Sequence, residues 1–518
     1  MNKRKITVII HETDEKLCAE LTASLKKVVV PNKFSLEIKA VKGAERFAAY
    51  EQARRSSDAK YKIYLDEHLV IVDENFLVEL LNIFKGDGKI GAVSTSGAIR
   101  LSTNGAVLKS ANRTNKNYSG EVDMLDCFFI ATQYDLPWRH ERYKDCVFGT
   151  QAQCMELRRA GCKLWVAAQD KPWIAHAGIK FKFKRDSCEK FLDDYSADLF
   201  PLVTVIIPTF NRPQYFKEAL DSALNQTYRN IEVVISDNST DDATERLVAG
   251  YDDKRIKYFR HKNFDAHDNW NFARSYNNPA AEYVNWLMDD DRFYPTKLEQ
   301  MVDVYRNNPE VSLVTSAKDY IDATGKVIGK SKALFKDNVT LTGNAAGRLL
   351  FLWDNYIGEP TTVLIRKKFL RDNDLCWNED ERGFFSLVDV STWLQLLSKG
   401  KLFRFTESLS CFRHHKQQAT YWKSTYALTP VSWIKLLKIA WDRKIFIQTE
   451  REFKLAAMRL TSTAINRLFE LSSKNVATKE VETLRRTFFA TVDSLRNGCK
   501  LELPAIEYSE QDTVKKIR

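Results

Sequence analysis

The stretch VTVIIPTFNR, residues 203–212, decides the fold of this chain. Its opening residues are apolar or β-branched, which predicts a buried strand, and Pro213 directly after it suits the first turn of a helix. The segment 215–226 then places one apolar face on that helix, formed by Phe216, Ala219, Leu220, Ala223 and Leu224. A strand that passes into an amphipathic helix is the repeating unit of an α/β sheet covered by helices.

The same opening occurs near the N-terminus, where ITVIIHE (6–12) reads as a buried strand followed by an amphipathic helix. Each copy continues alike, because IYLDEHLVIV (63–72) and VNWLMDDDRFYP (284–295) are apolar strands that run into acidic turns. We therefore predict an internal duplication: two Rossmann-like α/β domains in tandem, each with a mostly parallel sheet.

The predicted boundaries follow from composition. Residues 180–201 are charge-rich and lack a sustained apolar period, so a linker is expected at 186–200, after a first domain at 1–185. The second domain covers 201–425. Beyond it the strand signals fade, and 426–518 reads as a helical region.

Bulk composition narrows the classes of protein. The 518 residues are 44% hydrophobic and 28% charged, which is ordinary for folded globular domains. A formal charge of +11 suits phosphorylated substrates or an anionic surface, and no nucleic-acid-binding motif accompanies it, so nucleic acid is not an expected partner. The nine cysteines form no CxxC pair, and no apolar run resembles a signal peptide or a membrane span. We expect a cytoplasmic protein, with any membrane contact peripheral and at the inner face.

Polar residues follow two of the predicted strands of the second domain. Thr209, Asn211 and Arg212 lie where a strand end meets a helix N-terminus, which favours an anionic ligand. Asp237 ends the next strand and could accept a hydrogen bond from the N–H of a nucleotide base. For Ser239 to Asp242, helix capping is the favoured interpretation.

Three carboxylates, Asp289, Asp290 and Asp291, end a third strand. Gathering three negative charges is costly unless a divalent cation lies among them, and Mg²⁺ or Mn²⁺ bridging carboxylates to a diphosphate is a common arrangement. A solvated acidic turn is the alternative.

In this order and at these separations, VTVIIPTFNR, VVISDNSTDDAT (233–244) and NWLMDDDRFYP (285–295) resemble family 2 glycosyltransferases with a GT-A fold. The resemblance covers residues 201 to about 420. It implies a nucleotide-sugar donor bound by Thr209, Asn211, Arg212 and Asp237. The family's common Asp-x-Asp-Asp motif, aligned on Pro295, puts Met288 at its first position. Metal binding is then expected at Asp291, with Asp289 and Asp290 as helpers at the ribose or the metal.

Further segments resemble the acceptor side of the same family. Glu359, in GEPTTVLIRKKFL (358–370), is expected either to touch an acceptor hydroxyl or to cap a turn. Asp389, in LVDVSTWLQLLSKG (387–400), matches a carboxylate that could act as the catalytic base, or could cap its helix. In SLSCFRHHKQQAT (408–420), His415 is expected at the metal or the diphosphate and Arg413 at the phosphates.

The resemblance implies a metal-dependent inverting transferase with Mn²⁺ or Mg²⁺ as cofactor. It would move a sugar from a nucleotide diphosphate, expected to be UDP, to a hydroxyl of a glycan, lipid-linked or protein acceptor in surface polysaccharide or glycoconjugate synthesis. The alternatives are a non-catalytic nucleotide-sugar-binding or assembly scaffold and a two-domain polysaccharide synthase active in both halves. A nucleotidyltransferase is disfavoured because no glycine-rich, lysine-bearing phosphate loop is found.

The first half also resembles a glycosyltransferase-like family, through residues 47–76, 137–143 and 171–178, but its acidic positions differ. His68 stands where relatives carry a metal-binding Asp, although Asp66 and Glu67 lie beside it. Gly149 and Thr150 stand where a carboxylate would follow the PWR segment. We predict a fold without transfer activity; a second active site using Asp66 and His68 is the alternative.

The helical region contains WIKLLKIAWDRKIFIQ (433–448), which interleaves basic and bulky apolar residues. Such a pattern is found in interfacial membrane helices. Packing of its apolar residues on the catalytic domain is the preferred interpretation.

Overall fold

The computed structural model describes residues 1–43, 45–101, 107–111, 118–144, 146–176, 185–370, 387–415 and 423–505. The chain forms two compact units, unit 1 (Met1–Phe200) and unit 2 (Pro201–Arg518). Each unit is described by itself.

The segment predicted as a linker is a helix of unit 1, so this prediction was wrong. Residues Arg185–Leu199 form α5, and its inward face is made by Cys188, Phe191, Leu192 and Tyr195. The Tyr195 hydroxyl donates a hydrogen bond of 2.8 Å to Glu156 of helix α4 (Cys146–Arg159). The apolar positions do recur at helical spacing, but the high density of charges between them masked the period.

Unit 1 is built on a seven-stranded sheet of order β2-β1-β3-β10-β5-β11-β8. Strands β2, β1 and β3 run parallel, β10 is antiparallel to both neighbours, and β11 is again parallel to β5. The elements of this unit are β1 (Asn2–Glu12), α1 (Glu15–Leu25), β2 (Ser35–Lys42), α2 (Arg46–Arg55), β3 (Ala59–Asp66), β4 (Leu69–Ile71), α3 (Phe76–Gly86), β5 (Ile90–Ser94), β6 (Gly97–Leu101), β7 (Val107–Ala111), β8 (Gly120–Glu121), β9 (Met124–Leu125), β10 (Phe129–Thr132), α4, β11 (Lys163–Val166), β12 (Ile174–His176) and α5.

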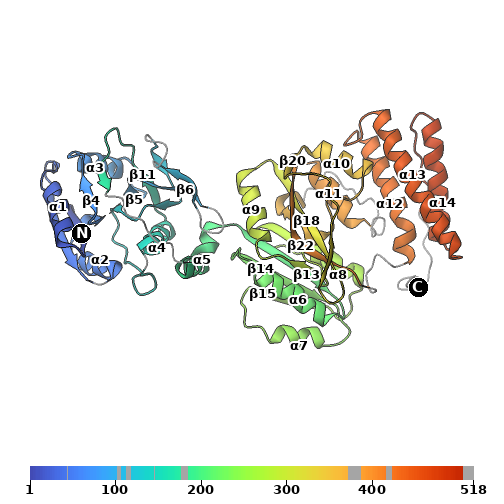
Figure 1. Ribbon diagram of the computed structural model, residues 1–518, viewed down its shortest axis with the longest axis horizontal. Coiled ribbons are helices and arrows are strands. Elements are labelled where there is room, and N and C mark those ends of the chain that lie inside the picture. The colour runs from blue at the N-terminus through green and yellow to red at the C-terminus, as the bar shows by residue number, and fades with distance from the viewer. Residues whose placement is uncertain are drawn as a thin grey trace. The chain divides into compact units, whose positions relative to one another are not determined.

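Unit 2 is built on a larger sheet with the main order β15-β14-β13-β16-β21-β18-β22-β17 (Figure 1). Its elements are β13 (Leu202–Thr209), α6 (Pro213–Leu224), β14 (Ile231–Asp237), α7 (Ala243–Ala249), β15 (Ile256–Arg260), α8 (Ala266–Ser275), β16 (Ala281–Trp286), β17 (Arg292–Phe293), α9 (Lys297–Asn307), β18 (Val311–Ile321), β19 (Val327–Lys330), β20 (Val339–Leu341), α10 (Gly343–Leu352), η1 (Pro360–Thr362), β21 (Val363–Arg366), η2 (Lys367–Leu370), α11 (Val388–Leu397), β22 (Lys401–Arg413), α12 (Lys423–Asp442), α13 (Glu450–Ser473) and α14 (Lys479–Arg496).

The two sheets repeat one topology. In both, three parallel strands, with β15 as a fourth at the edge in unit 2, are followed by an antiparallel one, β10 in unit 1 and β21 in unit 2. A parallel pair comes next, β5 with β11 and β18 with β22. Strand β1 therefore corresponds to β13, β2 to β14 and β3 to β16. The predicted α/β fold with an internal duplication is confirmed, although the sheets are mixed because β10 and β21 run against their neighbours.

The predicted strand and helix at the start of unit 2 are confirmed. Strand β13 is almost wholly buried between β14 and β16, and α6 begins at Pro213. The carboxyl ends of β13, β14 and β16 lie at one edge, because all three strands run parallel. This edge is where ligands bind in open α/β sheets.

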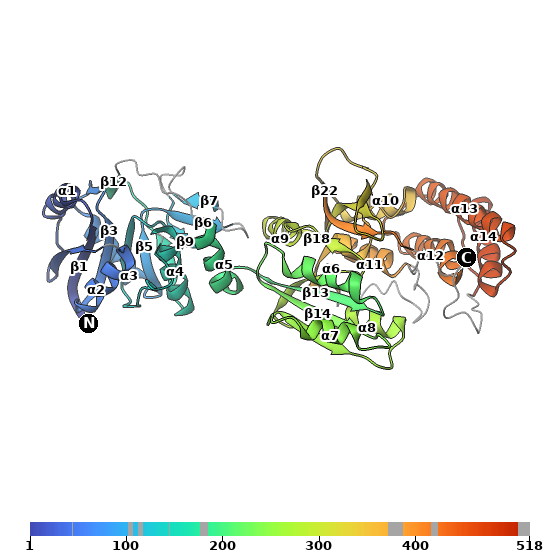
Figure 2. The same ribbon diagram turned by 60° about the horizontal axis from the view of Figure 1, so that its bottom comes forward.

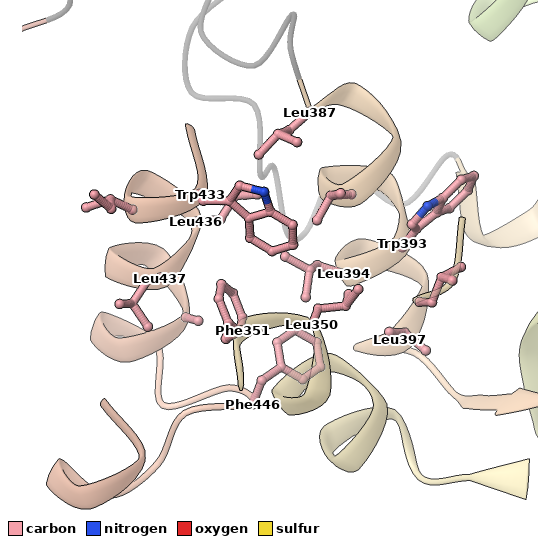
Figure 3. Packing of buried hydrophobic residues seen from close by; sticks show 14 of the residues in the cluster. Leu350, Phe351, Leu387, Trp393, Leu394, Leu397, Trp433, Leu436, Leu437 and Phe446 are labelled. Atoms are coloured by element: carbon pink, nitrogen blue, oxygen red, sulfur yellow. The ribbon is translucent and has the colours of Figure 1, made fainter. Parts of the chain in front are cut away.

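The C-terminal helices belong to unit 2. Helices α12, α13 and α14 lie side by side in Figures 1 and 2. Trp433 of α12 faces Phe351 of α10, with ring centroids 6.2 Å apart, and Leu436 and Leu437 of α12 belong to the same buried cluster as Leu394 of α11 (Figure 3). The apolar face of α12 is thus core, so the interfacial-membrane interpretation is wrong. Among the described residues, no helix has both the length and the apolar composition required to cross a bilayer.

Candidate active site

The acidic cluster follows β16, next to the carboxyl end of β13. Thr209 Oγ1 and the backbone N–H of Phe210 donate hydrogen bonds of 3.0 and 3.3 Å to Oδ2 of Asp289. Arg212 Nη1 lies 3.2 Å from Asp289 Oδ1 and 3.3 Å from Asp290 Oδ2. The structure therefore brings together Thr209, Arg212, Asp289 and Asp290, all of which were predicted as nucleotide-binding residues.

His415 joins this cluster through Asp290. Its Nε2 lies 2.8 Å from Asp290 Oδ2, and its ring centroid is 5.1 Å from that of Tyr215 on α6. The His415 side chain is almost completely buried, and Asp290 and Tyr215 hold its ring in place. Residues 416–420 of the predicted closing loop lie outside the described residues.

Asp291 points away from these residues. Its carboxylate accepts a hydrogen bond of 2.6 Å from Thr361 Oγ1 and one of 3.0 Å from the backbone N–H of Arg413. The side chain is completely buried, and each of its oxygens has a protein donor. The prediction that Asp291 is the principal metal ligand is therefore not supported by its geometry; its carboxylate joins the acidic turn to η1 and to the end of β22.

Arg413, predicted to balance the phosphates, is held by protein groups in the structure. Its guanidinium is fully buried, donates to the backbone carbonyls of Asp290, Asp322 and Ala323, and forms an ion pair of 2.6 Å with Glu218. Nε, Nη1 and Nη2 of this side chain thus all donate to protein acceptors. Arg212, whose side chain is 23% exposed, is the cation beside the carboxylates instead.

The cluster carries more negative charge than its surroundings balance. Burial and the neighbouring charge of Asp290 raise the pKa of Asp289 to about 6, despite Arg212 and the hydrogen bond from Thr209. Burial and Asp290 likewise raise the pKa of Asp291 well above its usual range. A bound cation would relieve this unfavourable charge.

The donor atoms suit a divalent cation that is shared with a diphosphate. Across the described ranges, no three His, Cys, Asp or Glu side chains gather closely enough to enclose a metal by themselves. Asp290 and His415 nevertheless converge, and Mg²⁺ commonly uses one or two protein carboxylates, with substrate phosphates and water completing its shell. The residues present therefore fit a cation held jointly with a ligand.

The predicted base-reading carboxylate ends β14 in a network of its own. Asp237 is completely buried and accepts hydrogen bonds from the backbone N–H of Ser239 (2.8 Å), the hydroxyl of Tyr258 (2.7 Å) and Arg260 Nη1 (2.7 Å). Asn211 lies nearby in a left-handed conformation, with φ of 54°, and its side-chain carbonyl accepts a hydrogen bond of 2.8 Å from the backbone N–H of Thr240. Asn211 thus connects the two loops that follow β13 and β14.

Asp389 occupies the first turn of α11 without capping it, since Leu387 is at the N-cap position. Asn355 Nδ2 donates a hydrogen bond of 3.1 Å to Asp389 Oδ2. Burial, with a further contribution from the negative charge of Glu359, raises the pKa of Asp389 to about 7. A carboxylate with this pKa is suited to proton transfer near neutral pH.

Glu359 pairs with Lys318 of β18 rather than capping a turn with its side chain. Its negative charge contributes to the raised pKa of both Asp291 and Asp389. Glu359 is therefore electrostatically connected to both the acidic cluster and the candidate base.

Several residues of this region were missed from the sequence: Lys318, Asn355, Thr361, Tyr258 and Arg260. Each meets its partner only through the sheet or through a turn between distant segments. The alternation of polar residues in IKYFR (256–260) was the one local signal for Tyr258 and Arg260.

Unit 1 repeats part of this arrangement. Glu67 follows β3 as Asp289 follows β16, and it accepts hydrogen bonds from the Thr13 hydroxyl and from the backbone N–H groups of Thr13 (2.7 Å) and Asp14 (3.0 Å). By strand register Thr13 corresponds to Phe210, whose N–H donates in the same way, and the Thr13 hydroxyl takes the part of the Thr209 hydroxyl. The next two residues differ, because His68 and Leu69 stand where unit 2 has Asp290 and Asp291.

The altered positions of unit 1 have other partners. His68 Nδ1 lies 2.7 Å from Asp66, which also pairs with Arg46 at 2.5 Å. Burial alone would raise the pKa of Asp66, but Arg46 and the hydrogen bonds from His68 outweigh it and lower that pKa. Gly149 lies against Phe47, and a Cβ atom added there would come within 2.0 Å of the Phe47 ring. An aromatic side chain therefore fills the space at Gly149, and Thr150 stands at the position of the expected carboxylate.

Comparisons with known proteins agree with the duplicated architecture. Residues 7–195 match the family described as glycosyltransferase like family, and residues 204–373 match glycosyl transferase family 2. An uncharacterized glycosyltransferase of Haemophilus influenzae is 29% identical over 230 residues, which cover 42% of this chain and 68% of that protein. The GalNAc(5)-diNAcBac-PP-undecaprenol beta-1,3-glucosyltransferase of Campylobacter jejuni is 34% identical over 104 residues, 20% of this chain and 32% of that enzyme.

Longer proteins and a solved structure are also similar to this chain. An uncharacterized glycosyltransferase of Rickettsia felis is 39% identical over 224 residues, 42% of this chain and 35% of that protein, and this chain spans about a third of the length of several such relatives. The structure of S. aureus TarS 1-349 in complex with UDP has a TM-score of 0.40 and 15% identity, covering 60% of this chain and 97% of that one. Each of the two units is thus similar to a glycosyltransferase family, in agreement with their related topologies.

Proposed function

We propose that unit 2 transfers a sugar from a UDP-sugar to an acceptor hydroxyl, with inversion at the anomeric carbon and with dependence on a divalent cation. The observation that carries the proposal is the environment of Asp389. A carboxylate whose pKa is raised to about 7, held by Asn355 in the first turn of a helix, has the properties of a general base.

The donor would lie along the carboxyl ends of β13, β14 and β16. Asp237 accepts three hydrogen bonds from protein donors, and an ionised carboxylate has about four acceptor positions, so one remains for the N–H of a uracil ring. Arg260, paired with the same carboxylate, supplies donors for a ring carbonyl. Asp289 and Arg212 come next along the strand ends, where the ribose and the diphosphate would lie.

The cation is assigned to Asp290 and His415, in place of Asp291. Bound there together with the diphosphate, Mg²⁺ or Mn²⁺ would neutralise charge on the leaving group. Arg212 contributes a second positive charge from the protein. Asp291 and Arg413 position the acidic turn through their hydrogen bonds to Thr361 and to the backbone.

The reaction is a direct displacement. The oxygen of the acceptor hydroxyl forms a bond to the anomeric carbon while the bond from that carbon to the diphosphate oxygen breaks. Asp389 accepts the proton of the hydroxyl, and Arg212 stabilises the departing diphosphate. Attack from the face opposite the leaving group inverts the anomeric configuration.

The acceptor is proposed to be a glycan that is lipid-linked, part of a polysaccharide or attached to a protein. The similarity to the C. jejuni relative, whose name describes an enzyme that acts on an undecaprenol-linked glycan, favours the lipid-linked class. We also propose that unit 1 does not transfer sugar, because His68 and Leu69 replace two of the three acidic residues and Thr150 stands where the further carboxylate is expected.

The test is a thermal-shift screen of UDP-sugars with and without Mn²⁺, followed by measurement of UDP release. A true donor is expected to stabilise only the cation-loaded protein, because a ligand that binds the folded state raises Tm by mass action. Equal stabilisation in EDTA would contradict the cation assignment. The absence of UDP release with any donor and acceptor would favour a non-catalytic nucleotide-sugar-binding scaffold.

A further inference from the structure

Trp353 is an exposed tryptophan at the end of α10. Its side chain is 51% exposed, whereas Trp286, Trp393 and Trp433 of the same unit are at most 6% exposed. Burial of an indole side chain stabilises a folded protein, and an exposed indole lacks most of this stabilisation. A tryptophan that faces solvent is therefore a candidate binding surface.

The position of Trp353 in the chain connects it to the candidate base. It directly precedes the turn 354–358, in which Asn355 donates to Asp389 and Gly358 has a φ of 102°. Two residues of extended chain span at most about 7 Å, so the backbone of Trp353 lies within roughly that distance of Asn355. The indole is therefore attached to the segment that orients the Asp389 carboxylate.

A second segment approaches the same indole from β19. Lys332 Nζ lies 5.8 Å from the centroid of the Trp353 ring. The preceding Ser331 is bonded to Lys318 in both directions, through N–H to carbonyl (2.8 Å) and through its hydroxyl, which accepts from the Lys318 N–H (3.1 Å). Lys318 in turn pairs with Glu359.

These contacts link Trp353 to the surroundings of Asp389. The links run from Trp353 through Lys332, Ser331 and Lys318 to Glu359, and along the chain to Asn355, which donates to Asp389. One ammonium group therefore lies beside the exposed indole, and a second ammonium group, a carboxylate and an amide that could bind sugar hydroxyls follow along the same links. An aromatic plane flanked by a few oriented polar groups is the composition of a small-molecule site.

We infer that Trp353 is the platform on which a pyranose ring of the acceptor stacks, with Lys332 holding the indole in place. The inference rests on the proposed function, because it assigns the acceptor side of the same site. Stacking of the C–H face of a sugar on the indole would place the sugar's hydroxyls next to Asp389 and Glu359. Trp353 is thereby a specificity-determining residue that favours glycan acceptors over small alcohols.

The test uses the full chain in two arms, with Trp353→Ala, Trp353→Phe and a matched control, Phe489→Ala. Phe489 is a similarly exposed aromatic, 54% exposed, on α14. In the first arm, binding of methyl β-pyranosides of glucose, galactose and N-acetylglucosamine is measured by saturation-transfer NMR without any donor. Trp353→Ala is expected to weaken binding about tenfold, as for loss of an aromatic anchor, while Trp353→Phe and Phe489→Ala retain most of it.

The second arm measures transfer to p-nitrophenyl β-pyranosides relative to hydrolysis of the UDP-sugar by water. Trp353→Ala is expected to lower this ratio about tenfold, because only the sugar acceptor uses the indole. Absence of pyranoside binding by the wild type, or binding and transfer ratio both unchanged in Trp353→Ala, would overturn the inference. Pyranoside binding that depends on Trp353, together with no UDP release from any donor, would instead contradict the proposed function alone.

Discussion

Asn355 Nδ2 donates a hydrogen bond of 3.1 Å to Oδ2 of Asp389, across 34 residues of sequence. The same amide also donates to the carbonyl of Gly358 at 3.3 Å, and its Oδ1 accepts from the Gly358 N–H at 3.1 Å. The turn that carries Glu359 and the helix that carries Asp389 are thereby joined by one side chain. The chemistry assigned to Asp389 depends on this junction.

Replacement of Asp389 by Asn should abolish transfer while keeping the donor bound. The amide has nearly the shape of the carboxylate but accepts no proton, so kcat should fall by about 10²–10⁴-fold. UDP affinity, measured by calorimetry with Mn²⁺ present, should change less than threefold. A variant that retains more than a tenth of wild-type kcat would exclude Asp389 as the base.

The same substitution should change stability in a pH-dependent way. The pKa of Asp389 is raised to about 7 from its usual value of 3.8, so ionisation costs the folded state more than the unfolded state. Stability should therefore decline as pH rises from about 4 to 7, and Asp389→Asn should remove this decline. At pH 8 the variant should be more stable by on the order of 1 kcal/mol, a value reduced for the partial solvent exposure of the group. Urea unfolding at pH 5 and pH 8 measures the difference.

Glu359→Gln should shift the acidic limb of the pH profile of kcat/KM to lower pH. Activity requires ionised Asp389, so kcat/KM should rise with pH through about 7 in the wild type. Removing the negative charge of Glu359 lowers the pKa of Asp389 and shifts the limb to lower pH. The shift is partial, because burial is the larger cause and remains. Glu482→Gln, which removes a surface carboxylate on α14, is the control and should leave the limb in place.

The carboxylates Asp290 and Asp291 should behave differently. Asp290→Asn should raise the Mn²⁺ concentration for half-maximal activity at least tenfold, since it removes a proposed ligand. Asp291→Asn should leave that concentration within about threefold, because Asp291 is buried and bonded to Thr361 and Arg413. A Mn²⁺ titration of both variants decides between them. A larger effect of Asp291→Asn than of Asp290→Asn on this concentration would assign the cation to Asp291.

Unit 1 should be dispensable for the chemical step. His68→Ala removes the hydrogen bond to Asp66 but leaves the Asp66–Arg46 ion pair. The free energy of unfolding should therefore be lower by on the order of 1 kcal/mol. Transfer by this variant should stay within about twofold of the wild type. A loss of more than tenfold, with stability retained, would indicate a second active site in unit 1.

The sequence by itself determined the fold class, the duplication and most of the strand-end residues. Strands such as 203–209 consist mainly of apolar and β-branched residues and pass into amphipathic helices, and these local patterns can be recognised without knowledge of the tertiary contacts. The order of motifs was also enough to indicate a family 2 glycosyltransferase. Charge density hid the apolar face of α5, so the expected linker was wrong.

Only the tertiary structure decided which way the acidic residues point. Asp289, Asp290 and Asp291 are consecutive, yet one meets Thr209, one His415 and one Thr361, partners that lie 80, 125 and 70 residues away. The same holds for Arg413, which the sequence suggested for phosphate binding and which the fold buries against Glu218. Identical side chains in adjacent positions differ in burial, hydrogen bonding and pKa only through neighbours that the folded sheet supplies, and no local pattern in the chain encodes those neighbours.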